Sequence, residues 1–239
     1  MVSSEKKEVN SCDCRYCNIR YKTIFADLNE LEMNLLSNVK KCRDYKKGEV
    51  VFKENTYPKG LYCIKDGKFK VSRIGTDQRE QIIHLAQKGD VMGFRALMGE
   101  DKYNCSSTAM DEATLCFIPK ETFMHLVEDS PKLSLRLIHF FSDMLKESEI
   151  KITVLGQNPV KERVLYSLCQ LINKYGFEND GCTINLSVMR QELADMAGTT
   201  RETATRILFD LESEEILKLS GKKIIVIDYP LLLKSANVF

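Results

Sequence analysis

The sequence contains no hydrophobic run near the length of about 18 residues that a membrane span requires, and its first ten residues lack the apolar segment of a signal peptide. It has only 3 histidines, no P-loop, no G-x-G-x-x-G motif and no set of residues that pairs a nucleophile with a base. The formal net charge of +1 gives no general attraction to nucleic acid. These absences predict a cytoplasmic protein that is not an enzyme, has no membrane partner and makes any DNA contact locally.

The chain does have the length for two domains, each with its own core, because 239 residues with 44% hydrophobic and 29% charged residues are typical of a globular protein of that size. Nine cysteines is an odd number, and in a reducing compartment it does not indicate a disulfide framework. From Cys42 to about Ile118, short β-rich runs alternate with turn signals such as Asp66-Gly67. This punctuation is typical of an antiparallel barrel or sandwich.

A long helix is expected to begin at Ser130-Pro131, an N-cap residue followed by proline, and to continue to about Leu155. Its apolar residues occupy more than one side, which favours a dimerisation helix that packs on its twin. The residues expected in the dimer contact are Leu133, Leu137, Phe141 and Met144. The alternative is a helix that packs only on its own barrel. Residues Gly156–Pro159 are expected to form the hinge to a second domain.

Residues Leu186–Leu217 predict two short helices joined by a turn. Gly198 is suited to end the first helix, and either Thr199 or Thr200 can cap the second. One face of the second helix is apolar, and the other carries polar groups that read base edges in a major groove. The predicted DNA-binding residues are Thr199, Thr200, Arg201, Glu202, Thr205 and Arg206. The alternative interpretation is an ordinary surface helix with a charged face.

A short strand expected at Thr183–Leu186 precedes the two helices, and a hairpin that includes Gly221 and Ile224–Ile227 follows them. Strand, helix-turn-helix and hairpin in this order predict a winged helix. The order favours DNA binding over a protein-contact surface, since the exposed helix face carries two arginines beside a threonine-rich helix start.

Several motifs occur in a specific order: KKGEVVFKEN, LYCIKDGKFKV, KGDVMGF, the helix from Ser130, NPVKERV and ELADMAGTTRETATRIL. With these motifs, residues 24–228 resemble the superfamily of the cyclic-AMP receptor protein and the fumarate–nitrate reduction regulator (CRP/FNR), which are dimeric bacterial transcription factors. The resemblance implies an α+β chain with a cyclic-nucleotide-binding-like β-roll (a jelly roll), a long dimerisation helix and a winged helix-turn-helix. The implied domains are residues 1–23 (a cysteine-containing segment), 24–129 (the sensor), 130–157 (the dimer helix and hinge) and 158–239 (the DNA-binding domain).

By the same resemblance, Arg201, Glu202 and Arg206 fall where the cyclic-AMP receptor protein places its base-reading residues. Arg201 suggests a half-site nearer TGTGA than TTGAT. A homodimer would place two recognition helices about 34 Å apart on double-stranded DNA, so the operator is expected to be an inverted repeat. RNA polymerase is the implied further partner, and activation the implied effect. The alternative function is a ligand-sensing β-roll that acts only through protein contacts.

The expected effector pocket departs from the pattern of cyclic-nucleotide-binding relatives. Cyclic-nucleotide-binding relatives hold the ribose and phosphate with a Gly-Glu-Leu turn and an Arg-Ser pair. Here the positions of the implied effector pocket are occupied by Phe94, Arg95, Tyr103 and Asn104. A buried phosphate without its arginine would be poorly neutralised, which argues against cAMP as the effector.

The cysteines offer another sensor. Cys14-x-x-Cys17 resembles the start of the oxygen sensor's cluster motif, and Cys116 matches that family's distant ligand, whereas the next expected cysteine falls at Thr23. Cys12 can supply the fourth thiolate, so Cys12, Cys14, Cys17 and Cys116 form a candidate ligand set for an iron–sulfur cluster or tetrahedral zinc. Ordinary reduced thiols are the other interpretation. A haem sensor would use His84, the one histidine in the β-rich region.

Overall fold

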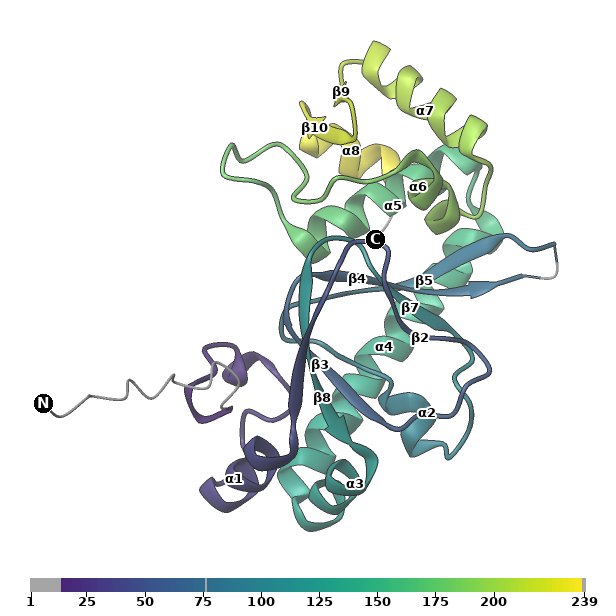
Figure 1. The fold of residues 1–239 in the computed structure, drawn as a ribbon. Coiled ribbons are helices and arrows are strands. Elements are labelled where there is room, and N and C mark those ends of the chain that lie inside the picture. Colours follow the sequence, from purple (N-terminus) through teal and green to yellow (C-terminus); the bar gives the residue numbers. More distant parts are fainter. Residues whose placement is uncertain (1–13, 76, 238–239) are drawn as a thin grey trace, which may run out of the picture. The chain divides into compact units, whose positions relative to one another are not determined.

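The computed structural model describes residues 14–75 and 77–237 (Figure 1). Contacts between its residues divide the chain into two compact units. The first unit runs to Phe69 and resumes over Ala86–Phe141. The second unit comprises Lys70–Leu85 together with the chain from Ser142 onwards. Each unit is therefore assembled from two separate stretches of sequence.

The elements up to the end of the sensor region are those of the expected β-roll with short helices at its ends. In chain order they are η1 (Cys14–Tyr16), η2 (Arg20–Lys22), α1 (Glu30–Val39), β1 (Lys41–Tyr45), β2 (Val50–Phe52), β3 (Gly60–Asp66), β4 (Lys68–Ile74), β5 (Glu80–Gln87), β6 (Val91–Met92), α2 (Phe94–Met98), β7 (Ser106–Ala109), β8 (Ala113–Pro119) and α3 (Lys120–Asp129).

The first sheet has the strand order β1-β8-β3-β6, and every pair in it is antiparallel. Strand β8 lies between β1 and β3, and its Cys116 is directly opposite Cys42 on one side and Cys63 on the other. Because directly opposed residues point to the same face of a sheet, these three cysteines form a row across three strands. A second sheet has the strand order β2-β7-β4-β5.

Helices α1 and α3 pack on each other and on the strands of the first sheet. The N-terminus of α1 is fixed by a capping box, in which Asn29 accepts a hydrogen bond from the amide of Glu32 and the Glu32 carboxylate accepts one from the amide of Asn29. Leu36 of α1 and Phe123 of α3 are almost fully buried. The described residues before α1, from Cys14 to Thr23, lie beside the cysteine-bearing sheet and line a pocket with Cys63 and Cys116.

Helix α4 extends over Pro131–Gln157, so it begins at the expected proline and ends two residues beyond the expected Leu155. Gly156 is therefore the penultimate residue of the helix, and the break in helical structure lies at Asn158 and Pro159. Val160 then opens the next helix.

The second unit contains the winged helix-turn-helix. Its elements are α5 (Val160–Tyr175), α6 (Arg190–Ala197), α7 (Arg201–Ser213), β9 (Leu217–Ser220), β10 (Lys223–Val226) and α8 (Tyr229–Ala236). The strand expected at Thr183–Leu186 is reduced to two isolated bridges, in which Thr183 pairs with Ile225 and Ile184 with Phe177. Helix α5 packs on α6, α7 and α8 around a core that includes Leu168, Leu193 and Leu208.

The stretch Lys70–Leu85 belongs to the second unit because its residues are bonded there. The Gln81 amide nitrogen donates to the carbonyl of Asp195 at 2.6 Å, near the end of α6. The Lys151 ammonium group of α4 donates to the carbonyl of Ile82 at 2.7 Å. Burial lowers the pKa of Lys151 to about 8.

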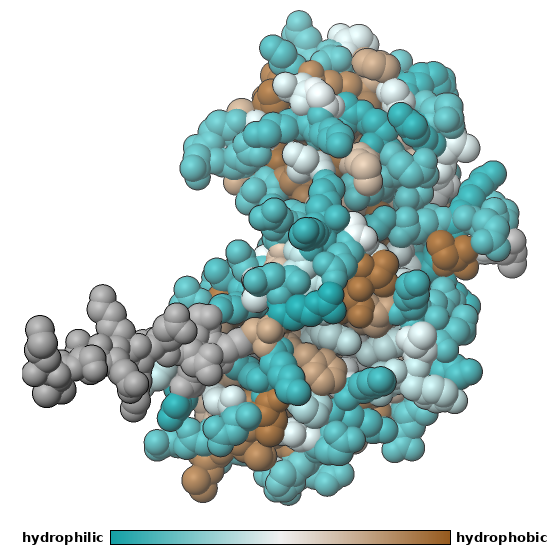
Figure 2. Space-filling view, in the orientation of Figure 1, coloured by the Kyte–Doolittle hydropathy of each residue, from teal (hydrophilic) through white to brown (hydrophobic). Residues whose placement is uncertain are grey.

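Hydrophilic residues cover most of the face seen in Figure 2, and hydrophobic ones appear in small separate groups. Among the helices of the described residues, none combines the length and the apolar character that crossing a bilayer would need. The apolar residues of the chain serve mainly to form the two cores.

The position of Lys151 predicts a pH-dependent stability. Between pH 8 and 10.5 the unfolded chain holds a proton on this lysine that the folded chain has released, so the free energy of unfolding rises with pH in that window, by up to about 3 kcal/mol. In Lys151→Met this rise should be absent. Urea unfolding at pH 7.5 and 10.5 measures it, and Lys146→Met, at an exposed position of the same helix, is the control. If the free energy of unfolding changed equally between pH 7.5 and 10.5 in the wild type and in Lys151→Met, Lys151 would not be the source of the pH dependence.

Candidate functional site

The turn between α6 and α7 has the geometry expected of a helix-turn-helix. Gly198 follows α6 with a φ of 60° in the left-handed region, which glycine adopts at little cost. Thr200, rather than Thr199, is the N-cap of α7, and its hydroxyl oxygen accepts a hydrogen bond from the amide of Thr203 at 3.2 Å. Thr199 is consequently free of a capping role.

Helix α7 has two contrasting faces. Ala204, Ile207, Leu208 and Leu211 are buried in the second unit. On the other side, Arg201, Glu202 and Arg206 are exposed, and Thr205 is half-buried with its hydroxyl donating to the carbonyl of Arg201 at 2.7 Å. Within the part of the chain that the structure describes, neither arginine forms an ion pair. The guanidinium groups are therefore available to an outside acceptor.

The β9–β10 hairpin supplies cations that the sequence analysis did not single out. Lys218 and Lys222 are exposed on this wing, and Arg190 of α6 fixes the wing by donating to the carbonyl of Gly221 at 3.2 Å. Exposed lysines on a wing are suited to contact phosphates. The signal in the sequence was the run Gly221-Lys222-Lys223 between two apolar strands.

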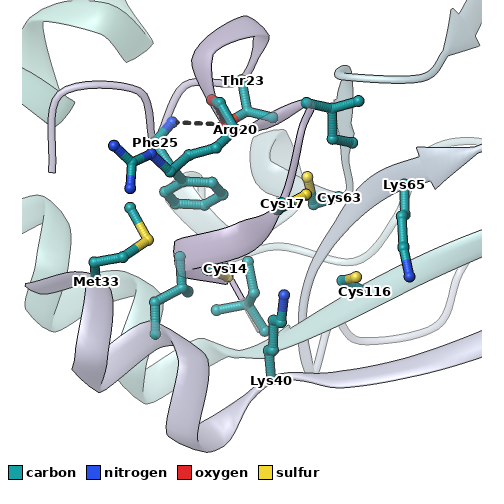
Figure 3. A pocket seen from close by; sticks show the side chains of 13 residues that line it. Cys14, Cys17, Arg20, Thr23, Phe25, Met33, Lys40, Cys63, Lys65 and Cys116 are labelled. Carbon is teal, nitrogen blue, oxygen red and sulfur yellow. Dashed lines mark hydrogen bonds between the residues drawn. The ribbon is translucent and has the colours of Figure 1, made fainter. Parts of the chain in front are cut away.

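A pocket lined by sulfur lies in the first unit (Figure 3). Cys14 and Cys17 line it from the segment before α1, and Cys63 and Cys116 line it from strands β3 and β8. The amide of Cys14 donates to the hydroxyl of Ser37 at 3.1 Å, which attaches this segment to α1. We refer to these four residues and the space they enclose as the cysteine pocket.

The structure thus brings together Cys14, Cys17 and Cys116, which the sequence predicts as ligands, and adds Cys63, which it does not predict. Cys12 lies outside the described residues. The sulfur of Cys42 is 2.7 Å from that of Cys116, but Cys42 does not line the pocket. Across the described residues, no three His, Cys, Asp or Glu side chains already have the spacing of a metal site. A metal would therefore have to draw the thiolates together.

The pocket also has cationic side chains in its lining. Arg20, Lys40 and Lys65 line it with the four cysteines. Burial lowers the pKa of Lys40, but its hydrogen bond with Cys14 and the charges of Cys14, Cys116 and Cys17 outweigh that effect and raise the pKa overall. Burial raises the pKa of the Cys63 and Cys116 thiols. Both therefore stay neutral at pH 7 unless a metal replaces the proton.

The predicted effector residues do not share one environment. Phe94 is buried and makes edge-to-face contacts with Phe140 and Phe141, with ring centroids 5.1 and 4.9 Å away. Tyr103 is buried and stacks on Phe52 at 4.1 Å. Arg95 and Asn104 are exposed. The Arg95 side chain therefore does not occupy the buried position that a phosphate partner would need.

The predicted dimer residues lie mostly on the inner face of α4. Leu133 and Leu137 are 1% and 3% exposed within their own chain, Phe141 packs on Phe94, and Met144 is half-buried. A different set of apolar residues is open on this helix, namely Leu135, Ile138, Leu145 and Ile152, which are 56–70% exposed. The free apolar surface of α4 is therefore formed by residues other than the four predicted ones. The remaining candidate, His84, lies 3.7 Å from the carboxylate of Glu147.

Comparison with known proteins agrees with this architecture. A family model described as a cyclic nucleotide-binding domain matches residues 42–130, and one described as a Crp-like helix-turn-helix domain matches residues 162–235. The fumarate and nitrate reduction regulatory protein of Vibrio cholerae is 29% identical over 94% of this chain and 90% of that protein. The anaerobic regulatory protein of Pasteurella multocida is 28% identical over 92% of this chain and 81% of its own length.

Solved structures show the same fold. FixK2 from Bradyrhizobium japonicum has a TM-score of 0.71 at 21% identity and covers 82% of this chain and 96% of its own. A transcriptional regulator of the CRP/FNR family from Thermus thermophilus has a TM-score of 0.70 at 22% identity, over 82% of this chain and 98% of its own.

A β-roll of the cyclic-nucleotide-binding type followed by a Crp-like helix-turn-helix defines the class of DNA-binding transcription regulators. The chain belongs to the CRP/FNR family of that class. The helix-turn-helix match favours DNA binding over the alternative of a β-roll that acts only through protein contacts.

Proposed function

We propose that this chain is a homodimeric regulator that reads an inverted repeat and senses oxygen or redox state through a metal centre in its cysteine pocket. The observation that carries the sensing part is the convergence of Cys14, Cys17, Cys63 and Cys116 on one pocket of the β-roll. The names of two relatives, which refer to fumarate and nitrate reduction and to anaerobic regulation, support the same signal.

The DNA-reading part of the proposal uses the exposed face of α7. Arg201 and Arg206 each present a planar fork that matches guanine O6 and N7, and Glu202 can accept from cytosine N4. All three lie within the first two turns of α7, and the N-terminal turns are the part of a recognition helix that reaches base edges. Lys218 and Lys222 of the wing would contact phosphates and contribute no sequence preference.

Replacing Arg206 tests this division of roles. Arg206→Ala should weaken binding to a TGTGA-type inverted repeat by about 1–3 kcal/mol and relax discrimination at one base pair, since a bidentate base contact is lost. Binding titrations against operators changed at each half-site position measure both effects. Lys222→Ala is the control and should weaken all operators nearly equally. A uniform loss in Arg206→Ala would make Arg206 a phosphate contact.

The homodimer part of the proposal uses the exposed face of α4. Leu135, Ile138, Leu145 and Ile152 are spaced by three or seven residues, with Ser142 and Glu149 at the two intervening positions. This is the a/d spacing of a coiled coil, in which each apolar side chain inserts between residues of a second helix. A second copy of the same helix would bury side chains that are otherwise left in water.

Charges on this stripe should separate the subunits. The double change Ile138→Glu with Leu145→Glu should give a monomer by sedimentation velocity with an unchanged circular dichroism spectrum, because both side chains are exposed in a single chain. Asp143→Lys, on the same helix outside the stripe, is the control and should remain dimeric. A dimer that survives the double change would place the interface elsewhere.

The sensing part of the proposal depends on whether the cysteine pocket suits a metal. Thiolate sulfur is the ligand of iron–sulfur clusters and of structural zinc, and four sulfurs are the usual number. The cations Arg20, Lys40 and Lys65 would offset the negative charge that four thiolates bring. When bound, an iron–sulfur cluster supplies a centre whose charge and stability depend on oxidants. The exposed position of Arg95 gives no support to cAMP as the effector.

Purification without oxygen tests the metal. The wild-type chain should contain iron and sulfide and show a broad visible absorption that bleaches in air, and Cys116→Ser should lose both. Cys169→Ser removes a buried cysteine of α5 outside the pocket and should keep them. A colourless, metal-free wild-type chain that still binds its operator would exclude a metal sensor.

The remaining parts of the proposal follow from the family. We assign sensing to residues 24–129 with the preceding cysteine segment, dimerisation to 130–157 and DNA binding to 158–239. RNA polymerase is the proposed further partner, and the cytoplasm the proposed location, where a bacterial operator is accessible. A change in the cysteine pocket would shift the population of dimers whose α7 helices are spaced for successive major grooves.

A further inference from the structure

The cysteine pocket contains one more thiol than the known motif of the resemblance explains. Cys63 lies on β3 directly opposite Cys116 on β8, so both side chains are on the same face of the sheet. Lys65 and Ile118, each two residues along its own strand, line the same pocket, which is what a single strand face requires. Cys63 therefore faces the pocket and not the other side of the sheet.

The resemblance expects a further cysteine ligand at position 23, but this position is a threonine with a structural role. Thr23 lines the pocket and is 5% exposed, but its hydroxyl donates to the carbonyl of Arg20 at 2.8 Å and accepts from the amide of Phe25 at 3.1 Å. The hydroxyl thus fixes a turn. The amino-terminal side of the pocket contributes two sulfurs from the described residues, Cys14 and Cys17, and the sheet side contributes the other two.

The charge in the pocket points to the same conclusion. Lys40 is half-buried among the sulfurs, and none of the ion pairs in the described parts of the chain gives it a carboxylate partner. A cation withdrawn from water needs a negative partner. A centre ligated by four cysteines would provide that partner. The alternative, that Cys63 is an ordinary core cysteine, explains its burial but not its place in one pocket with Cys14, Cys17 and Cys116.

We propose that Cys63 is a metal ligand and that Cys14, Cys17, Cys63 and Cys116 together hold the metal centre. This inference rests on the proposed metal sensor and specifies its ligands. On binding, the S–H bond of each of the four thiols is replaced by a metal–sulfur bond, and the four protons pass to solvent. Cys14 and Cys17 belong to a short 3-10 turn and the residue after it, so they can approach the two sulfurs held by the sheet.

The ligand set predicts which cysteines are dispensable. After anaerobic reconstitution with ferrous iron and sulfide, Cys63→Ser and Cys63→Ala should hold at least about 10-fold less iron and sulfide than the wild type, because one of four ligands is lost. Cys169→Ala is the matched control, since Cys169 is also a buried free cysteine but does not line the pocket. Cys12→Ala is the second control. Both controls should retain the wild-type content.

A second measurement leaves Cys63 in place, so the ligand set can be tested even if the Cys63 variants fail to fold. The chain with Cys12→Ala and Cys42→Ala is loaded with zinc, and X-ray absorption counts its ligands. Four sulfurs at about 2.3 Å are expected, since Cys14, Cys17, Cys63 and Cys116 remain. The cobalt-substituted form should show the thiolate charge-transfer absorption of a four-sulfur tetrahedral site.

The outcomes separate this inference from the proposed function. The role of Cys63 is overturned, and the metal sensor left intact, if Cys63→Ser holds as much metal as the wild type. The same conclusion follows if zinc in the Cys12→Ala, Cys42→Ala chain has fewer than four sulfur ligands. A wild-type chain that binds neither reconstituted cluster, zinc nor cobalt overturns both.

Discussion

The antiparallel register of β8 between β1 and β3 is the constraint on which the sensor half of this protein depends. A shift of β8 by one residue would turn Cys116 to the other face of the sheet and separate it from Cys63. The register is held by pairing on both sides of β8, with β1 and with β3. The pocket is therefore as well defined as the sheet, while its other wall, from Cys14 to Thr23, is attached by single hydrogen bonds and a few buried side chains.

Much of the fold could be predicted because its signals are local. Gly198, the start of α4 at Pro131 and the two faces of α7 follow from residue types at fixed spacing. Strands β1 and β7 could not be predicted in this way. The first is the charged run KCRDY and the second the small polar run SSTA, and each is a strand because of the partner it pairs with. The same applies to Thr183–Leu186, where alternation suggests a strand but only isolated bridges form.

The two candidate sites differ in the same way: one depends on local sequence and the other on pairing between distant segments. The reading face of α7 is a property of one helix, so the sequence was sufficient to bring Arg201, Glu202, Thr205 and Arg206 together. The cysteine pocket joins three segments that are distant in the chain. Spacing therefore identified Cys14 and Cys17, and the resemblance identified Cys116, but only strand pairing reveals Cys63. On α4, the sequence shows apolar residues on more than one side of the helix. Only the structure shows which of them are already buried within their own chain.

The assignment of Lys70–Leu85 to the DNA-binding unit also bears on how this chain can exchange parts with its relatives. The two units are interleaved in sequence, so no single cut in the chain returns both of them whole. A recombination event at the break after α4 would transplant α6 and α7 without the strand that carries Gln81, and the carbonyl of Asp195 would lose its donor. Successful chimaeras therefore have to inherit a compatible β4–β5 hairpin together with the helices it contacts, which ties the inheritance of the sensor's second sheet to that of the DNA-binding domain.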